Sequence, residues 1–303
     1  MTHRIELELP FTAPLTPSNL FGHLAATAVP GVEEYRDGWF RAAVPLRHGS
    51  AVLAAALPDG GVVPAVLLLG DDRDEAQAVA RLRAMLDLDV DPRAVHEVLG
   101  RDPLLRPLLA AAPGRRVPGS ADPAAMALRA VLGQQVSTAA ARTHAGRLVR
   151  AFGRPVHDPE GGLTALFPEP AALAAAGSAL DEAARMPAGR RRTLVALARA
   201  LEAGTVDPQG PVAPLRAALA AIPGIGPWTV DTIAMRAAGD RDAFLPTDLG
   251  VRLAARRLGL PATPGGLTRR AEVWSPFRAY AVQYLWATGE HPVNSLPAAS
   301  PAR

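Results

Sequence analysis

The segment that most constrains the fold of this chain, residues 219–249, combines a glycine-rich turn with a separate carboxylate. The turn reads Pro223-Gly224-Ile225-Gly226 and joins two stretches whose apolar residues recur at helical spacing. Its glycines allow close backbone approach, and N–H groups at the start of the following helix can bind an anion. Asp248 follows at the mouth of another helical stretch. The segment predicts a phosphate clamp with a catalytic acid; the alternative is an ordinary corner between two helices.

The chain contains neither cysteine nor lysine, so all 32 Lys+Arg residues are arginine. This excludes disulfides, cysteine-ligated zinc, iron–sulfur clusters and lysine Schiff bases. Charge is uneven: residues 1–114 hold 10 Arg and 15 Asp+Glu (−5), whereas residues 115–303 hold 22 and 14 (+8). Phosphate contacts are therefore expected in the second portion. The arginines at 115–116 and 190–192 are candidates; the alternative is that they are solvated at helix ends or in loops.

Strand patterns are confined to the first 89 residues. Strands are expected at 4–9, 38–45, 51–57 and 62–69, and helices at 17–29, with Ser18 as a possible cap, and 72–88. These elements predict a small α+β domain with an antiparallel sheet. No apolar run reaches membrane-spanning length and the N-terminus is no signal peptide, so a cytoplasmic protein without membrane contact is expected.

Helical patterns separated by Pro and Gly fill the rest of the chain. Helices are expected at 92–99, 104–111, 123–152, 169–176, 179–184, 190–203, 212–221, 229–238, 249–258, 268–274 and 276–288. The longest is expected to be less regular near Gly133. The Pro-, Ser- and Ala-rich end, from residue 294, is expected to fray.

The glycine-rich turn at residues 223–226, called the hairpin from here on, and Asp248 together resemble the helix–hairpin–helix DNA glycosylase superfamily. In that superfamily Gly-x-Gly is followed by a helix, a short loop and Pro-x-Asp, here Pro246-Thr247-Asp248. The resemblance implies DNA-backbone contacts from Gly224, Ile225, Gly226 and Thr229. It also implies a monovalent cation, Na⁺ or K⁺, on the backbone carbonyls of Ala220, Ile222 and Ile225.

Asp248 has two interpretations. Ahead of a helix it can cap exposed N–H groups, which contributes about 1 kcal/mol, although Thr247 could cap instead. The resemblance makes Asp248 the catalytic carboxylate. Cleavage of an N-glycosidic bond builds positive charge on the deoxyribose, and a nearby carboxylate stabilises that charge or orients water toward C1′. We favour the catalytic role because the hairpin accompanies it.

Trp228 occupies the position at which strand-cutting members carry a nucleophilic lysine. Members with an iron–sulfur cluster need cysteines, which this chain lacks. The resemblance therefore implies a monofunctional enzyme that uses water and leaves an abasic site. No redox cofactor and no catalytic metal are expected.

Trp228 and Trp274 are candidate walls of a base pocket, since an indole face attracts cationic bases such as 3-methyladenine and 7-methylguanine. The alternative is that both anchor the core. Residues 274–281 (WSPFRAYA), with Trp286 beyond them, are similar to the C-terminal signature of the DNA-3-methyladenine glycosylase II (AlkA-like) family.

Residues 128–137 (LRAVLGQQVS) resemble the segment that carries the minor-groove wedge of that family. Gln134 would face the pocket or the DNA, and Gln135 falls at the wedge position; the alternative is a polar helix face. His23 takes a place held by phenylalanine in one member and is a pocket candidate or an ordinary structural histidine. Thr232 and Leu249 stand where well-known members line the cleft with tyrosines, so this pocket is less aromatic.

The implied architecture is α+β: an antiparallel-sheet (TBP-like) domain at 1–89 followed by two helical lobes. One lobe is discontinuous, 90–118 with 241–292, and carries the acid; the other is 119–240, and 293–303 form a flexible tail. The expected partner of this monomer is double-stranded DNA containing damaged bases, in a bacterial nucleoid. Two alternatives remain: a glycosylase for deaminated or oxidised purines, and a non-catalytic DNA-damage-binding protein.

Overall fold

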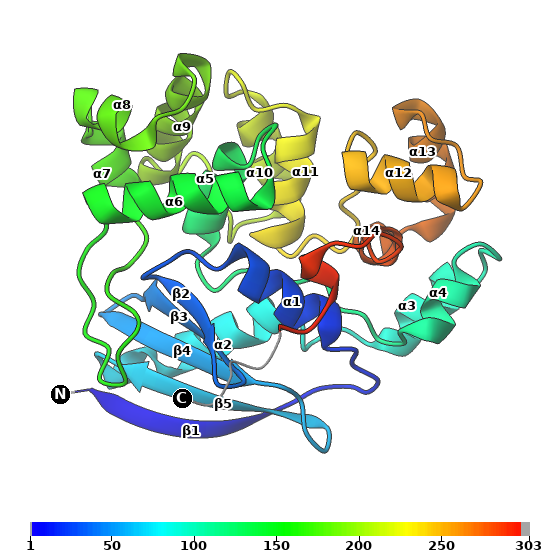
Figure 1. Ribbon diagram of the computed structural model, residues 1–303, viewed down its shortest axis with the longest axis horizontal. Coiled ribbons are helices and arrows are strands. Elements are labelled where there is room, and N and C mark those ends of the chain that lie inside the picture. Colours follow the sequence, from blue (N-terminus) through cyan, green and yellow to red (C-terminus); the bar gives the residue numbers. More distant parts are fainter. Residues whose placement is uncertain (1, 298–303) are drawn as a thin grey trace.

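In the computed structural model, which describes residues 2–297, the N-terminal part of the chain forms a five-stranded antiparallel sheet (Figure 1). The strand order is β1-β5-β4-β3-β2. The strands are His3–Pro10 (β1), Glu33–Arg36 (β2), Trp39–Pro45 (β3), Ser50–Ala56 (β4) and Val62–Leu69 (β5). Strand β2 was not predicted, because its sequence EEYR lacks apolar alternation; it is an edge strand held by pairing with β3.

Both faces of the sheet are covered, which explains why β4 and β5 are almost continuously apolar. Helices α1 (Ser18–Thr27) and α2 (Glu75–Leu86) pack against one face, where residues such as Leu53 and Leu67 join their core. The loop between α6 and α7 covers the other face through Leu163 and Leu166. Helix α1 begins after Pro17, and Ser18 does not cap it with its side chain.

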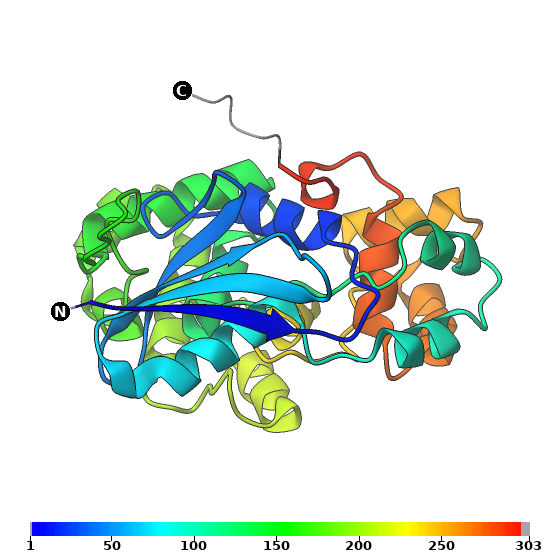
Figure 2. The same cartoon turned by 90° about the horizontal axis from the view of Figure 1, so that it is seen from below.

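The remaining helices form two groups: in Figure 1, α5 to α11 lie above the sheet domain, and α3, α4 and α12 to α14 lie to the right of it, where Figure 2 also shows them. They are α3 (Pro92–Leu99), α4 (Arg106–Ala111), α5 (Pro123–Leu132), α6 (Thr138–Phe152), α7 (Pro170–Ala175), α8 (Ser178–Ala184), α9 (Ala188–Glu202), α10 (Val212–Ala220), α11 (Pro227–Arg236), α12 (Leu249–Arg257), α13 (Pro264–Ala271) and α14 (Arg278–Trp286). The single helix expected over 123–152 is instead two helices. A turn at residues 133–137 separates them, and the side chain of Ser137 caps α6.

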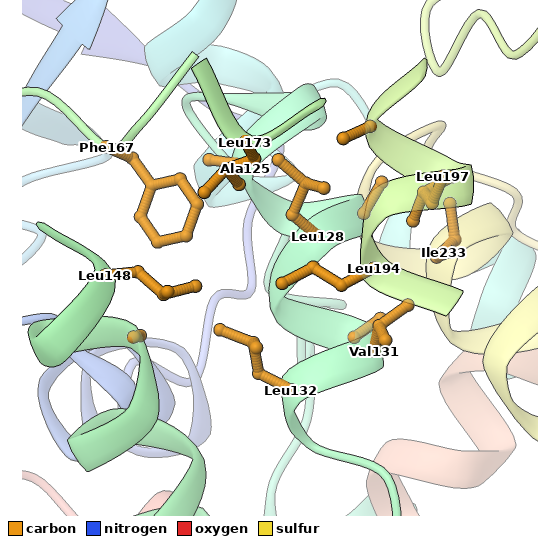
Figure 3. Close-up of a cluster of buried hydrophobic side chains, with 14 of the residues drawn as sticks. Ala125, Leu128, Val131, Leu132, Leu148, Phe167, Leu173, Leu194, Leu197 and Ile233 are labelled. Atoms are coloured by element: carbon orange, nitrogen blue, oxygen red, sulfur yellow. The ribbon is translucent and has the colours of Figure 1, made fainter. Parts of the chain in front are cut away.

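Each group of helices has its own apolar core. The first core is built from α5 to α11, and Figure 3 shows Leu128 and Val131 of α5 facing Leu194 and Leu197 of α9. The second core joins α3 and α4 to residues from α12 to α14, although these segments are far apart in sequence. Helix α11 contributes to both, through Ile233 in the first core and residues 234–235 in the second.

The end of the described chain is packed rather than free. Residues Pro292–Asn294 form a 3-10 turn, η3, that lies against α1. Gly22 makes this contact possible, because a Cβ there would lie 2.2 Å from the carbonyl oxygen of Ser295. The expectation of a flexible tail from residue 293 is therefore wrong for its first residues, and 298–303 lie outside the described residues. No helix in the range 2–297 is long and apolar enough to cross a membrane.

Arg116 is fully buried, so it is not the phosphate contact that the sequence suggested, and Arg115 beside it is also buried. The Arg116 guanidinium donates to the carbonyls of Val90 (3.2 Å), Thr12 (2.6 Å) and Pro14 (3.2 Å). Its own carbonyl accepts from the side chain of Asn19 (2.7 Å). Arg116 therefore ties the sheet domain to the segment that leads into the helices.

We predict that Arg116→Met lowers the free energy of unfolding by about 2 kcal/mol, because three backbone carbonyls lose their donor. Urea denaturation monitored by circular dichroism measures the change. Arg93→Met is the matched control: Arg93 is exposed on α3 and only 3.6 Å from Asp91, so its loss should cost about 0.5 kcal/mol or less. Equal effects of the two substitutions would contradict the role given to Arg116.

Candidate active site

A cavity of about 610 Å³ lies where the sheet domain and both helical groups meet. Helix α1, the α5–α6 turn, helices α11 and α12 and the segment after α14 contribute to its wall. Its side chains include His23, Arg129, Trp228, Arg236, Asp248 and Trp286. The volume is typical of a small-ligand site.

Asp248 is held at this cavity by three N–H donors from three elements. Its Oδ2 accepts from Trp228 Nε1 of α11 (3.0 Å), and its Oδ1 accepts from Trp286 Nε1 of α14 (2.8 Å). Oδ1 also accepts from the backbone N–H of Val251 (3.0 Å), which makes Asp248 the cap of α12. The capping role considered for Thr247 is thus taken by Asp248 itself. A carboxylate has about four acceptor sites, so Oδ2 keeps one free.

The structure places different tryptophans at the cavity from those that the sequence predicts. Trp228 lines the cavity, as expected, and Trp286 lines it too. Trp274 does not: it is completely buried in the second core, stacks edge-on against Phe244, and donates from Nε1 to Asp102 (2.8 Å). The expected pocket role of Trp274 is therefore wrong, and the alternative of a core anchor is correct. No local pattern separates Trp274 from Trp286, because both lie in the same apolar C-terminal stretch.

The glycine-rich turn joins α10 to α11, and its two glycines have different environments. Gly224 has φ +88°, and a Cβ there would lie 2.0 Å from Thr193 Oγ1. Gly226 is exposed, and a Cβ there would meet no atom within 4 Å. Ile225 is buried in the first core and its N–H donates to the carbonyl of Ile222 (3.1 Å). The turn therefore leaves an open approach over Gly226 to the start of α11.

Gln134 connects this turn to the α5–α6 turn instead of lining the cavity. Its Nε2 donates to the carbonyl of Gly224 (3.0 Å) and to Thr229 Oγ1 (3.0 Å). Thr229 is almost fully buried, so its side chain cannot make the surface DNA contact that was expected. Gln135, the next residue, is exposed and has φ +55°, an uncommon conformation for a residue other than glycine. Gln134 thus braces an exposed, strained Gln135 beside the hairpin.

His23 lies in the cavity wall, in contact with a buried arginine. Its Nδ1 is 3.3 Å from Arg236 Nη1. Burial, followed by the positive charge of Arg236, lowers the pKa of His23 well below its ordinary value. Burial also lowers the pKa of Arg236, to about 9, with Arg129 as the second cause.

The remaining candidate residues lie either at the cavity or near the start of α9. Thr232 lines the cavity and donates to the carbonyl of Trp228 (2.7 Å), whereas Leu249 is 67% exposed at the cavity. Arg191 pairs with Asp181, and Arg192 is exposed near the start of α9. Among residues 2–297, no three His, Asp or Glu side chains cluster in a way that could hold a metal ion.

Comparisons with known proteins place these features in a family. Residues 6–122 match the family model of the AlkA N-terminal domain. The probable bifunctional transcriptional activator/DNA repair enzyme AlkA of Mycobacterium tuberculosis is 49% identical over 296 residues, which is 97% of this chain and 59% of that relative. The chain thus spans about three-fifths of that protein. DNA-3-methyladenine glycosylase 2 of Escherichia coli is 34% identical over 274 residues, covering 89% of this chain and 92% of that relative.

Solved structures share the fold. The 3-methyladenine DNA-glycosylase from Archaeoglobus fulgidus superposes with a TM-score of 0.80 at 21% identity, covering 93% of this chain and 97% of that one. The Schizosaccharomyces pombe 3-methyladenine DNA glycosylase in complex with abasic DNA gives 0.53 at 24% identity, covering 66% and 98%. The predicted α+β fold class, an antiparallel-sheet domain followed by helical lobes, is confirmed.

The different surroundings of the two glycines predict different responses to a methyl group. Gly224→Ala should lower the free energy of unfolding by about 2 kcal/mol, because of its positive φ and the collision with Thr193. Gly226→Ala, with φ −93° and open space, should change it by less than about 0.5 kcal/mol. Parallel urea titrations measure both, and an unaffected Gly224→Ala variant would refute the tight packing of the turn.

Proposed function

The chain belongs to the DNA-3-methyladenine glycosylase 2 family, and we propose that it is a monofunctional DNA glycosylase of base excision repair. It would release alkylated bases of the 3-methyladenine and 7-methylguanine type by hydrolysis and leave an abasic site. The observation that carries the proposal is the Asp248 carboxylate, held by two indole N–H groups at a cavity large enough for a base.

The reaction needs little beyond this carboxylate. When the N-glycosidic bond breaks, its electron pair leaves with the base and positive charge develops at C1′ of the deoxyribose. The negative charge of Asp248 stabilises that transition state. A water oxygen then bonds to C1′, and one water proton passes to the released base or to solvent. The free acceptor site on Oδ2, beside Trp228, is suited to hold that water.

Substrate binding would use the indole of Trp228. An indole face attracts cations, and alkylation at N3 or N7 gives a purine nucleotide a positive charge. Such bases leave readily, so the site needs no strong general acid. The base must first leave the duplex, at a cost of a few kcal/mol that is smaller for a damaged pair.

DNA would bind across the exposed turns. Gly226 lets a phosphate approach the N-terminus of α11, and the carbonyls of Ala220, Ile222 and Ile225 would hold a bridging Na⁺ or K⁺. Gln135 protrudes beside the hairpin and would fill the space left by the extruded base. The partner is double-stranded DNA containing damaged bases, and the protein would act on it as a monomer in the bacterial nucleoid.

We predict that Asp248→Asn lowers the single-turnover rate of base release from methylated DNA by roughly 10²–10³-fold. Asparagine is as good a cap as aspartate, so α12 should remain intact. Chromatography of the free bases measures the loss, and gel-shift titration with abasic-site DNA should show binding within about threefold of wild type.

Asp207→Asn is the control, because Asp207 is exposed in the α9–α10 loop and is expected to leave release unchanged. If the Asp248→Asn variant released bases as fast as the wild-type protein, Asp248 would not be the catalytic carboxylate. Binding to damaged DNA by a wild-type protein that releases no base would favour the alternative of a non-catalytic binder. Strand cleavage before alkali treatment would contradict the monofunctional mechanism.

The two C-terminal tryptophans provide a second prediction. Trp286→Phe removes one donor to Asp248 and should lower base release by roughly tenfold, the equivalent of one lost hydrogen bond to a charged group. Trp274→Phe removes the donor to buried Asp102 and should lower the unfolding free energy by about 2 kcal/mol without a comparable loss of release. Release assays and denaturation on both variants test the pair. A large loss of release in Trp274→Phe, without one in Trp286→Phe, would support a pocket role for Trp274.

A further inference from the structure

One wall of the cavity carries an imidazole N–H that has no hydrogen-bond partner among the residues that the structure describes. His23 on α1 and Arg236 at the end of α11 meet through His23 Nδ1 and Arg236 Nη1, 3.3 Å apart. A guanidinium only donates, so Nδ1 must be the acceptor. The neutral imidazole therefore carries its hydrogen on Nε2.

The Nε2–H faces no partner within the described part of the chain. None of the hydrogen bonds among residues 2–297 involves His23 Nε2, and His23, which is half-buried, belongs to the cavity wall. An unused N–H in a site of this kind is available to a ligand acceptor.

The charges around His23 keep it neutral. Arg236 of α11 is 5% exposed, and its Nε has no hydrogen-bond partner within residues 2–297. Arg129 of α5 is paired with Glu33 of β2 at 2.7 Å. His291, in the segment after α14, also lies near His23. A protonated His23 would add a further positive charge beside two guanidiniums, and burial already lowers its pKa well below the ordinary value.

We propose that His23 is a specificity-determining residue whose Nε2–H donates to a carbonyl oxygen of the extruded base. This inference rests on the proposed glycosylase function and specifies which alkylated purines it favours. Bases that present a ring carbonyl, such as 7-methylguanine, gain a hydrogen bond. Bases that present an amino group there, such as 3-methyladenine, place a donor against a donor and leave both unsatisfied. The nearby Arg236 charge polarises the imidazole and strengthens this donor.

The test measures two bases from one reaction. DNA treated with dimethyl sulfate contains both 7-methylguanine and 3-methyladenine, and chromatography gives the ratio of their single-turnover release rates. His23→Phe keeps a ring but removes the donor, and should lower the ratio of 7-methylguanine to 3-methyladenine release about fivefold to tenfold. His23→Gln restores a donor and should recover most of that ratio. His157→Phe, at an exposed position outside the cavity, should leave it unchanged.

A second measurement needs no variant. Free 7-methylhypoxanthine and 7-methyladenine differ in the group at position 6 and the accompanying N1 proton, and the carbonyl compound should inhibit the wild-type enzyme about fivefold more strongly. Equal inhibition by the two, or an unchanged release ratio in an active His23→Phe enzyme, would overturn the assignment of His23. A wild-type protein that releases neither base would instead overturn the proposed function, so the two failures are distinguishable.

Discussion

The position of the Asp248 carboxylate depends on the packing of the whole helical part of the molecule. Trp228 reaches Asp248 from α11, a helix shared by both apolar cores, and Trp286 reaches it from α14 in the second core. Asp248 in turn caps α12, which packs against α14. Because three helices fix one carboxylate, its orientation is set before substrate arrives. Such preorganisation is what makes a fixed charge effective against charge that develops in a transition state.

The DNA-facing turns are coupled in a comparable way. Gln134 bonds both the carbonyl of Gly224 and the hydroxyl of Thr229, so the α5–α6 turn and the hairpin cannot move independently. Gln135 is held in a left-handed conformation immediately beside this brace. Strained residues of this kind persist only where the surroundings determine them. The two hydrogen bonds of Gln134 therefore support the exposed position of its neighbour.

The sequence predicted elements well where periodicity was strong and less well where tertiary contacts decided the outcome. Helix α3 was predicted with its observed bounds, and in the structure the side chain of Asp91 caps it. Strand β2 has no such pattern and exists because β3 pairs with it. In the site, the linked motif located Asp248 and Trp228. It could not distinguish Trp274 from Trp286, since an indole serves a core and a cavity equally well, nor foresee that Arg116 would be buried among carbonyls.

The cavity has opposite electrostatic character on two of its walls, and this asymmetry would orient a base. Asp248 and the indole of Trp228 line the cavity and favour positive charge, so they would stabilise a cationic ring and the charge that develops on the sugar. Arg236, with His23 as its hydrogen-bond acceptor, favours an electron-rich oxygen. An alkylated guanine satisfies both walls at once, because its charge is spread over the alkylated ring and its carbonyl lies on the other ring. An adenine derivative satisfies only the first. Selectivity would thus arise from two separate contacts, with catalysis confined to the wall that holds Asp248.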